Sequence, residues 1–376
     1  MNQALVRVVS LASLAGLGFV SMTCAAHGAE AVGAAASAST GGAGAAVGIA
    51  QGVRPDATML QYPDVWGDRI VFSYANDLWL APKTGGVATK LASPPGQEMF
   101  PKFSPDGKTI AFVGNYEGNR DLYTIPADGA GVAVRVTHHP GGETLCDWTP
   151  DGKELIFYTT GLGGLTRQQQ LFAVSATGGL PRQLPVPYGT FASVSPDGSW
   201  LAYTPHTTDF RTWKRYRGGM ATDIWLFNLN DKTSKKATDW EGTDTAPMFD
   251  PASARGNANT LYYLTDNGEN HLQNIWTFDP STGKRTQVTN FDQFDIKWPS
   301  MGRGEMVFQN GAKLFLLDLK TAKSTEIDVV IPGDRPTLRA KSVDYSGYIT
   351  GGDLTNTGKR VVVEARGDLW SLPAQK

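Results

Sequence analysis

The chain has 376 residues, of which 41% are hydrophobic and 19% are charged, so it can bury one large core or two modest ones. Its formal net charge of −2 argues against a nucleic-acid partner, because phosphate binding needs a clustered excess of Lys and Arg. The 43 glycines and 22 prolines suit a protein made of many short strands and turns.

Residues 1–29 have the form of a secretory signal peptide. One basic residue, Arg7, precedes an apolar stretch over residues 8–20, and small residues near its end offer a cleavage site. The stretch is shorter than the roughly 20 residues of a membrane span, so we expect export to the periplasm or the outside, without further membrane association. An N-terminal anchor and lipidation of Cys24 are the alternatives. Residues 30–54, mostly Ala, Gly and Ser, are predicted to be a tether.

A β-hairpin is predicted over residues 104–125. Ser-Pro-Asp-Gly at 104–107 is typical of a tight turn, because proline presets φ, aspartate can bond its own backbone and glycine supplies a positive φ. β-Forming residues follow at 109–113, and the second strand is Asp-Leu-Tyr-Thr-Ile at 121–125.

Seven copies of this unit occur along the chain. Their second strands begin 39 to 55 positions apart, at Asp77, Asp121, Gln170, Asp223, Asn274, Lys313 and Asp368. Strand units with a period of about 40 to 50 residues indicate a β-propeller, whose ring of blades protects the strand edges. A residue that recurs in successive blades usually serves the fold, and we expect these aspartates to cap turns or to accept backbone N–H groups.

Once the signal peptide is removed, Cys146 is the single remaining cysteine, so no internal disulfide is expected. Its place before Asp147-Trp148 favours a buried structural thiol over a nucleophile.

The sequence holds no recognisable catalytic motif. Gly-x-Ser-x-Gly, His-Glu-x-x-His and paired Cys-x-x-Cys are all absent, so we expect no metal and no cofactor, and enzymatic activity of this chain is left open. Residues 138–143 are interpreted as a solvated loop. Residues 266–270 are interpreted as a hairpin turn rather than a calcium loop.

Two segments resemble the tricorn protease family. The first is the run Pro63-Asp64-Val65-Trp66-Gly67-Asp68-Arg69-Ile70-Val71-Phe72 with the following Asp77-Leu78-Trp79, which is similar to the family's opening blade. The second and more specific is Trp213-Lys214-Arg215-Tyr216-Arg217-Gly218-Gly219 in the fourth repeat. The resemblance extends from Tyr62 to the end of the chain.

This resemblance implies an all-β fold, with a six-bladed propeller of four-stranded blades over residues 55–331. Residues 332–376 are then a linker and the incomplete first blade of a second propeller, because a segment with two prolines and a glycine interrupts the repeats at 331–336. The strands from about residue 343 onward are expected to be poorly stabilised, since so few strands are marginal in water.

The resemblance also implies a function. The full-length family is one of serine peptidases, and this chain would be their non-catalytic front, which admits peptides or unfolded polypeptide and contributes to contacts in a homo-oligomer. Its natural end at Lys376 is left open, and a truncated product or fragment is expected. The family archetype works inside the cell, so a cytoplasmic location is the alternative to export.

The candidate binding residues are Trp213, Lys214, Arg215, Tyr216 and Arg217. Three cations beside two rings could hold a peptide carboxylate or stack on a ring. The alternative, which we favour, is an insertion that packs on its own blade or on a partner subunit.

Two rival functions remain. A stand-alone periplasmic propeller like that of the Tol system, acting as a protein-binding scaffold, would use Asp368-Leu369-Trp370 in a closed seven-bladed ring. The propeller lid of a prolyl oligopeptidase-like enzyme would need an α/β-hydrolase domain after the ring.

Overall fold

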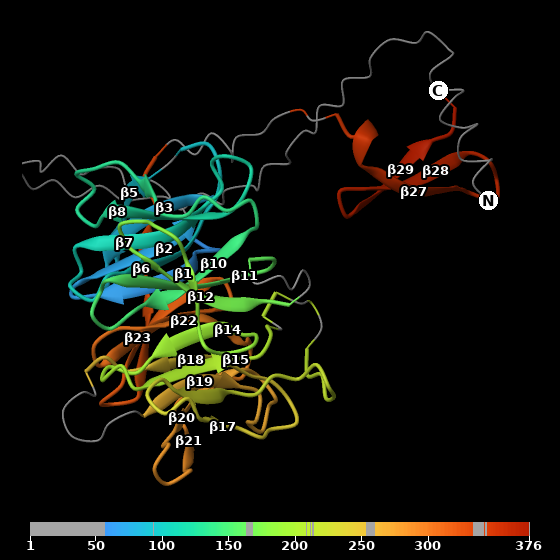
Figure 1. Ribbon diagram of the computed structural model, residues 1–376. Coiled ribbons are helices and arrows are strands. Elements are labelled where there is room, and N and C mark those ends of the chain that lie inside the picture. The colour runs from blue at the N-terminus through green and yellow to red at the C-terminus, as the bar shows by residue number, and fades with distance from the viewer. Residues whose placement is uncertain are drawn as a thin grey trace, which may run out of the picture. The chain divides into compact units, whose positions relative to one another are not determined.

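The computed structural model describes residues 57–92, 94–162, 168–207, 209–210, 212, 214–252, 260–333, 342 and 344–375 (Figure 1). The predicted signal peptide and tether lie outside the described residues. The chain divides into two compact units, one of which comprises residues 50–332 and the other the C-terminal residues 333–376. No helix among the described residues is long and apolar enough to cross a membrane.

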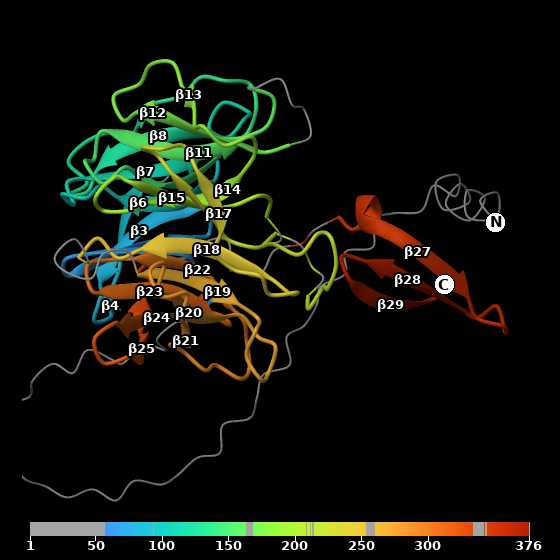
Figure 2. The same cartoon turned by 60° about the horizontal axis from the view of Figure 1, so that its bottom comes forward.

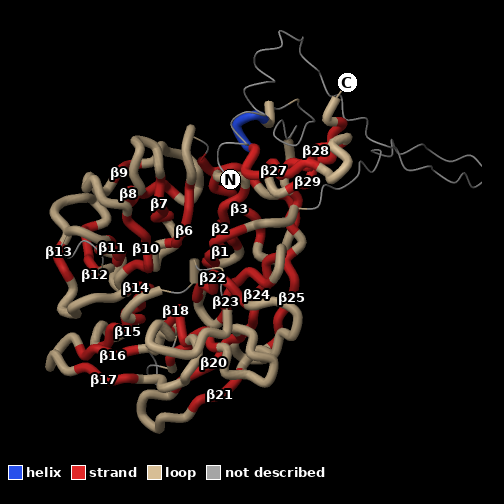
Figure 3. Tube along the Cα trace, turned by 90° about the vertical axis from the view of Figure 1, so that its right-hand side faces the viewer, coloured by secondary structure: helices blue, strands red, loops and turns tan. Residues whose placement is uncertain are grey.

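The described residues of the first unit form six four-stranded antiparallel sheets, each a meander of consecutive strands around the ring (Figure 3). Blade 1 comprises β1 (Gln61–Trp66), β2 (Arg69–Tyr74), β3 (Asp77–Pro82) and β5 (Thr89–Ala92). Blade 2 comprises β6 (Glu98–Phe103), β7 (Thr109–Gly114), β8 (Asp121–Pro126) and β9 (Val134–Arg135). Blade 3 comprises β10 (Glu143–Trp148), β11 (Glu154–Thr159), β12 (Gln170–Ser175) and β13 (Arg182–Gln183). Blade 4 comprises β14 (Thr190–Val194), β15 (Trp200–Thr204), β16 (Trp225–Asn228) and β17 (Ser234–Lys236). Blade 5 comprises β18 (Asp244–Phe249), β19 (Leu261–Thr265), β20 (Asn274–Phe278) and β21 (Arg285–Gln287). Blade 6 comprises β22 (Ile296–Met301), β23 (Glu305–Asn310), β24 (Lys313–Asp318) and β25 (Lys323–Ile327).

The predicted hairpin is confirmed as β7 and β8, which pair from Thr109 with Pro126 to Gly114 with Asp121. The Pro-Asp-Gly turn joins β6 to β7, and the Gly107 amide donates to the Ser104 carbonyl at 2.8 Å. Gly107 has a φ of +71°, and a Cβ there would lie 2.2 Å from the indole of Trp66 in blade 1. Glycine is therefore required both by the turn and by the contact between blades.

The hydrophobic core lies between neighbouring blades rather than within one. Between blades 1 and 2, for example, Val71 and Leu78 pack with Ile110, Phe112 and Tyr123. Each sheet thus buries its faces against the sheets beside it, which explains why one blade cannot be stable by itself.

The ring closes with six blades, because β1 of the first blade contacts β22 and β23 of the sixth. At this seam β4 (Gly86–Val87), labelled in Figure 2 near the strands of the sixth blade, pairs in parallel with β26 (Val329–Val330), which follows that blade. The Gly86 amide donates to the Asp328 carbonyl at 2.8 Å, and an ion pair of 2.7 Å joins Lys83 to Glu305. The prediction that the seventh repeat is not a seventh blade is confirmed.

Three of the recurrent aspartates, Asp77, Asp121 and Asp223, behave differently from the prediction. Each forms an ion pair with a cation on the fourth strand of its own blade instead of capping a turn. In blade 6 the cation, Lys313, lies on the third strand and the carboxylate, Glu326, lies on the fourth. The pairs are Asp77 with Lys90, Asp121 with Arg135 and Asp223 with Lys236, each at 2.7 Å, and Lys313 with Glu326 at 2.5 Å. The pairing serves the fold, as expected, by fastening the outermost strand.

The C-terminal unit is an incomplete blade. It has a 3₁₀ turn, η2 (Ser346–Tyr348), and three antiparallel strands, β27 (Ile349–Leu354), β28 (Arg360–Ala365) and β29 (Asp368–Pro373). Most of its side chains are exposed, including Leu369 at 77%. Exposure on this scale fits the expectation that these strands are poorly stabilised.

Candidate functional site

The innermost strand of every blade is interrupted by a β-bulge near its middle. The register shifts fall at Tyr62-Pro63, Phe100-Pro101, Cys146, Phe191, Ala246-Pro247 and Trp298-Pro299. Five of the bulged residues have a positive φ: Tyr62 (51°), Phe100 (53°), Phe191 (30°), Ala246 (51°) and Trp298 (50°). Bulges re-aim side chains, and a strained backbone of this kind clusters at functional sites.

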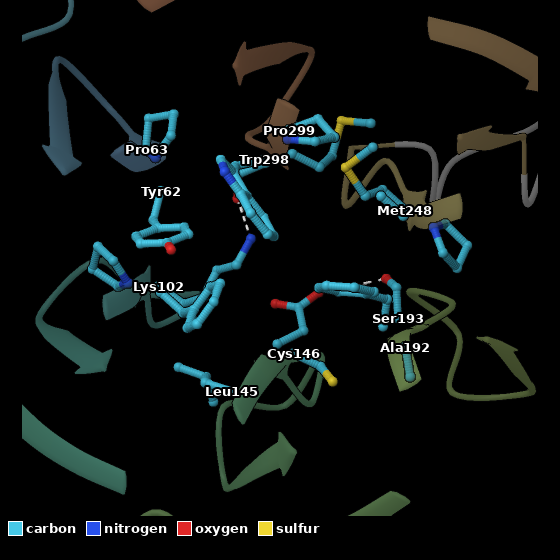
Figure 4. Close-up of a pocket in the computed structure, with 18 of the residues that line it drawn as sticks. Tyr62, Pro63, Lys102, Leu145, Cys146, Ala192, Ser193, Met248, Trp298 and Pro299 are labelled. Atoms are coloured by element: carbon cyan, nitrogen blue, oxygen red, sulfur yellow. Dashed lines mark hydrogen bonds between the residues drawn. The ribbon is translucent and has the colours of Figure 1, made fainter. Parts of the chain in front are cut away.

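The bulges direct their side chains into a pocket on the ring axis, to which all six blades contribute (Figure 4). The pocket has about 80 Å³ of room for the centres of water molecules, several times the ~10–15 Å³ that one water needs. It is much smaller than the roughly 300–1,000 Å³ of a pocket that encloses a whole drug-sized ligand. It therefore suits one small polar group with its stem.

One wall of the pocket is a cluster of aromatic rings. Trp298 lies 4.9 Å from Tyr62, 5.6 Å from Phe100 and 6.3 Å from Phe191, measured between ring centroids. Phe210 comes from the segment between β15 and β16, and its ring lies 5.1 Å from that of Trp298. Phe210 is 51% exposed, so this ring lies where the cluster meets solvent.

A chain of polar groups spans the pocket from blade 2 to blade 1. The Lys102 ammonium donates to the Ser300 hydroxyl, which donates to Asp64 Oδ1. The Phe103 amide donates to Asp64 Oδ2 at 2.6 Å. Burial raises the pKa of Asp64, and the nearby Lys102 charge opposes that rise.

Asp147, on the neighbouring β10, is held less completely. Its Oδ1 accepts from the adjacent Trp148 amide at 2.8 Å, and its Oδ2 accepts from the Ser193 hydroxyl at a long 3.4 Å. Burial raises the pKa of Asp147 to about 6, although Lys102 works in the opposite direction.

Cys146 is buried, as predicted, and also lines the pocket. Burial raises the pKa of its thiol to about 12, so the nucleophilic thiolate is scarce at neutral pH. Within the described part of the chain, no three His, Cys, Asp or Glu side chains are grouped so as to hold a metal ion.

The candidate residues from the cationic segment lie against blade 5 and the start of blade 6. Lys214 forms an ion pair with Asp295 at 2.5 Å, and Arg215 donates to the His271 carbonyl at 3.3 Å. Tyr216 is 37% exposed, and Trp213 lies outside the described residues.

Arg217 is the most firmly held residue of this segment. Its guanidinium lies 3.1 Å from Asp266 and 4.8 Å from the Trp240 ring centroid. Asp266 also accepts from the Trp240 indole at 2.7 Å. These partners occupy the cations and favour the packing interpretation of the segment.

Residues 266–270 lie, as interpreted, in the connection between the paired strands β19 and β20. Asp266 in this connection is 3% exposed and anchors the insertion through Arg217 and Trp240, which lie 49 and 26 positions away in the sequence, so no local pattern shows these contacts. One interpretation is wrong: Glu143, assigned to a solvated loop, is fully buried at the start of β10, where Thr137 donates to it.

The fold and the pocket can now be compared with known proteins. The chain matches the family described as "Tricorn protease N-terminal beta propeller domain" over residues 57–323. The chain belongs to this family. The resemblance found in the sequence is confirmed, and the chain's first unit is a tricorn-type propeller.

Curated relatives agree with this assignment. The tricorn protease homolog of Saccharolobus solfataricus is 24% identical over 317 residues, which cover 83% of this chain and 28% of the relative. Tricorn protease homolog 1 of Streptomyces coelicolor is 26% identical over 325 residues, which cover 85% and 29%. The tricorn-type propeller chain thus spans less than a third of the length of these relatives.

Solved structures share the propeller fold. The tricorn protease gives a TM-score of 0.65 at 22% identity, covering 84% of this chain and 30% of that one. TolB from Acinetobacter baumannii gives a TM-score of 0.52 at 17% identity, covering 69% of this chain and 63% of that one. At these identities the likeness shows the fold alone.

The sequence analysis missed the axial pocket of this tricorn-type propeller. Its polar groups come from different parts of the ring, with Lys102, Asp147, Ser193, Asp209 and Ser300 distant from one another in the sequence. One available signal was a proline near the middle of four inner strands, at Pro63, Pro101, Pro247 and Pro299, since proline inside a strand marks a bulge.

Proposed function

We propose that this chain is the non-catalytic N-terminal propeller of a tricorn-like serine peptidase and that its axial pocket binds peptide. The supporting observation is the convergence of aromatic and charged side chains from six blades on one pocket. Concave sites with an apolar wall and a few polar groups are the usual places for ligands. In this proposal catalysis belongs to regions that the longer relatives have beyond the part matched here, and several copies of the whole protein assemble together.

Fluorescence anisotropy with labelled, unstructured peptides tests the proposal on the full chain. Met301 lines the pocket, and Met301→Trp fills it, so we expect peptide affinity to fall at least about tenfold. The matched control is Met59→Trp, because Met59 is 69% exposed and outside the pocket. If the wild-type chain binds no peptide, or if both variants bind equally well, the proposal is wrong.

A Tol-like scaffold is the rival function, and the likeness to TolB supports it only at the level of the fold. Its expected seven-bladed ring does not form, because the ring closes with six blades. A scaffold would bind a folded partner on its outer surface and would not respond to Met301→Trp.

We also propose that the chain is exported on residues 1–29. The apolar stretch over residues 8–20 after one basic residue supports this. N-terminal sequencing of the protein from a fractionated bacterial host is expected to give a start near residue 29 in the periplasmic or secreted fraction. An intact Met1 in the cytoplasmic fraction would contradict export.

A further inference from the structure

We propose that the axial pocket recognises a primary ammonium group attached to an aromatic or apolar body, with the Asp147 carboxylate as its receptor. The inference deepens the proposed function, on which it rests, because a peptide's N-terminus is such a group.

The charges inside the pocket favour a cation over an anion. The charged side chains that line the pocket are one cation, Lys102, and two carboxyl groups, Asp147 and Asp209, so the lining has an excess of one acidic group. The single cation is already engaged, because Lys102 donates to Ser300 within the chain that ends on Asp64. A ligand carboxylate would therefore have to displace an internal contact, whereas a ligand ammonium would supply the missing charge.

Asp147 has capacity to spare that Asp64 lacks. Asp64 accepts from a backbone amide at 2.6 Å and from a hydroxyl, so both its oxygens have close donors. Asp147 Oδ2 has only the long 3.4 Å contact with Ser193 among the described residues. A carboxylate can accept several hydrogen bonds, so an ammonium could bind Asp147 without breaking the contact to Trp148.

The rings provide the place for the rest of the ligand. Trp298, Phe191 and Phe210 form one cluster, with centroids 5.1 to 6.4 Å apart. A cation near such faces gains further attraction, and an apolar body gains burial. The small interior admits the ammonium and its stem, while the body stays at the half-exposed Phe210.

The acidity of Asp147 gives the proposal a second readout. The groups around this carboxyl are Lys102 from β6, Asp64 from β1, Ser193 from β14 and its neighbour Cys146, and Asp209 lines the same pocket. With a pKa of about 6, the carboxyl is mostly ionised at pH 7 and mostly protonated at pH 5. Amine binding is therefore expected to be about tenfold weaker at pH 5 than at pH 7.

Isothermal titration calorimetry on the full chain tests the proposal with four probes of similar shape. Phenylalaninamide and 2-phenylethylamine carry the ammonium, N-acetylphenylalaninamide lacks it, and 3-phenylpropionate replaces it with a carboxylate. We expect the two amines to bind at least about tenfold more tightly than the other two. Equal binding of the acetylated probe, or preference for the carboxylate, would overturn the proposal, as would no binding of either amine.

Asp147→Asn identifies the receptor. Asparagine keeps an acceptor for Trp148, so the fold is expected to survive, and an unchanged thermal midpoint verifies this. Amine affinity is expected to fall at least about tenfold and to lose its dependence on pH between 5 and 7. The control is Asp68→Asn, because the Asp68 side chain is 94% exposed. Unchanged amine affinity in Asp147→Asn would refute the role of this residue. If that variant does not fold, the pH dependence of the wild-type chain decides instead, and its absence would refute the role.

A dipeptide amide distinguishes the two sources of the ammonium. If it binds more tightly than 2-phenylethylamine, the group belongs to a peptide N-terminus, and the reverse order indicates a free amine. Both orders support ammonium recognition. The proposed function fails separately: peptides that bind equally well with acetylated N-termini would preserve it and refute this inference. Amine binding without any peptide binding would refute the proposed function and preserve this inference.

Discussion

Alanine in place of Gly85 is expected to loosen the seam that closes the ring. Gly85 has a φ of +90°, and a Cβ built on it would lie 2.6 Å from the main-chain oxygen of Asp328. That oxygen belongs to the backbone, so relief requires β4 and β26 to separate. The two hydrogen bonds at risk run from the Gly86 amide to Asp328 and from the Ala88 amide to Val330, both at 2.8 Å.

The expected cost follows from two contributions. An alanine forced into this conformation costs about 1–3 kcal/mol. Loss of two backbone hydrogen bonds adds about 0.5–1.5 kcal/mol each. Gly85→Ala should therefore lower the free energy of unfolding by about 2–6 kcal/mol. Gly86 is a matched control, because its φ is +121° and nothing lies within 4 Å of its Cβ position, so Gly86→Ala should show the first contribution alone.

Urea denaturation of the two variants, with hydrogen exchange at the Ala88 amide, measures the difference. We expect Gly85→Ala to be the less stable variant and its Ala88 amide to exchange faster than in Gly86→Ala. Equal stability together with equal exchange would refute the close packing of β4 on the end of blade 6.

Three further predictions concern the ion pairs between strands, the buried carboxyl groups and Phe210. Asp121→Ala should lower the free energy of unfolding by about 3–5 kcal/mol, because the Asp121 side chain is fully buried against Arg135. Lys313→Ala breaks the exposed pair with Glu326 and should lower it by only about 0.2–1 kcal/mol. Similar losses for the two variants in thermal unfolding would contradict this difference. Burial raises the pKa of three carboxyl groups at blade boundaries to about 7, namely those of Glu98, Glu143 and Asp244. Their contribution to the free energy of unfolding is therefore full below about pH 4.5 and is lost as the pH rises through 7. The urea midpoint should fall from pH 5 to pH 8, and Glu98→Gln should remove up to about 3 kcal/mol of that fall; an unchanged slope would contradict the assignment. Phe210→Ala should change the free energy of unfolding by less than about 1 kcal/mol and weaken the binding of 2-phenylethylamine in calorimetry, because it removes a ring that holds the ligand body; unchanged affinity would argue against Phe210 as part of the site.

The fold was predictable because its determinants are local. Pro-Asp-Gly turns, β-forming runs and the spacing of the second strands indicate blades without any knowledge of tertiary contacts. The break at residues 331–336 lies where the chain divides into its two compact units. The ion pairs between third and fourth strands were partly visible, since Asp77 and Lys90 or Lys313 and Glu326 lie 13 positions apart.

The pocket was not predictable in the same way. Its receptor carboxylate, Asp147, has no motif around it, and it meets Lys102 and Ser193 only because the ring brings β6, β10 and β14 to one axis. The cationic segment shows the opposite case. Its charges are concentrated in sequence, yet Lys214 and Arg217 are paired with acidic residues of blade 5 and the loop before blade 6.

Photo-crosslinking is the most direct test of the claim that the axial pocket is the peptide site. A short peptide with a free N-terminus and a photoreactive phenylalanine at its first position is irradiated with the full chain, and the linked residues are identified by mass spectrometry. The account predicts links to residues that line the pocket, such as Met248, Met301 and Trp298, and their loss when the peptide is acetylated. Links confined to the outer strands, unaffected by acetylation, would contradict it.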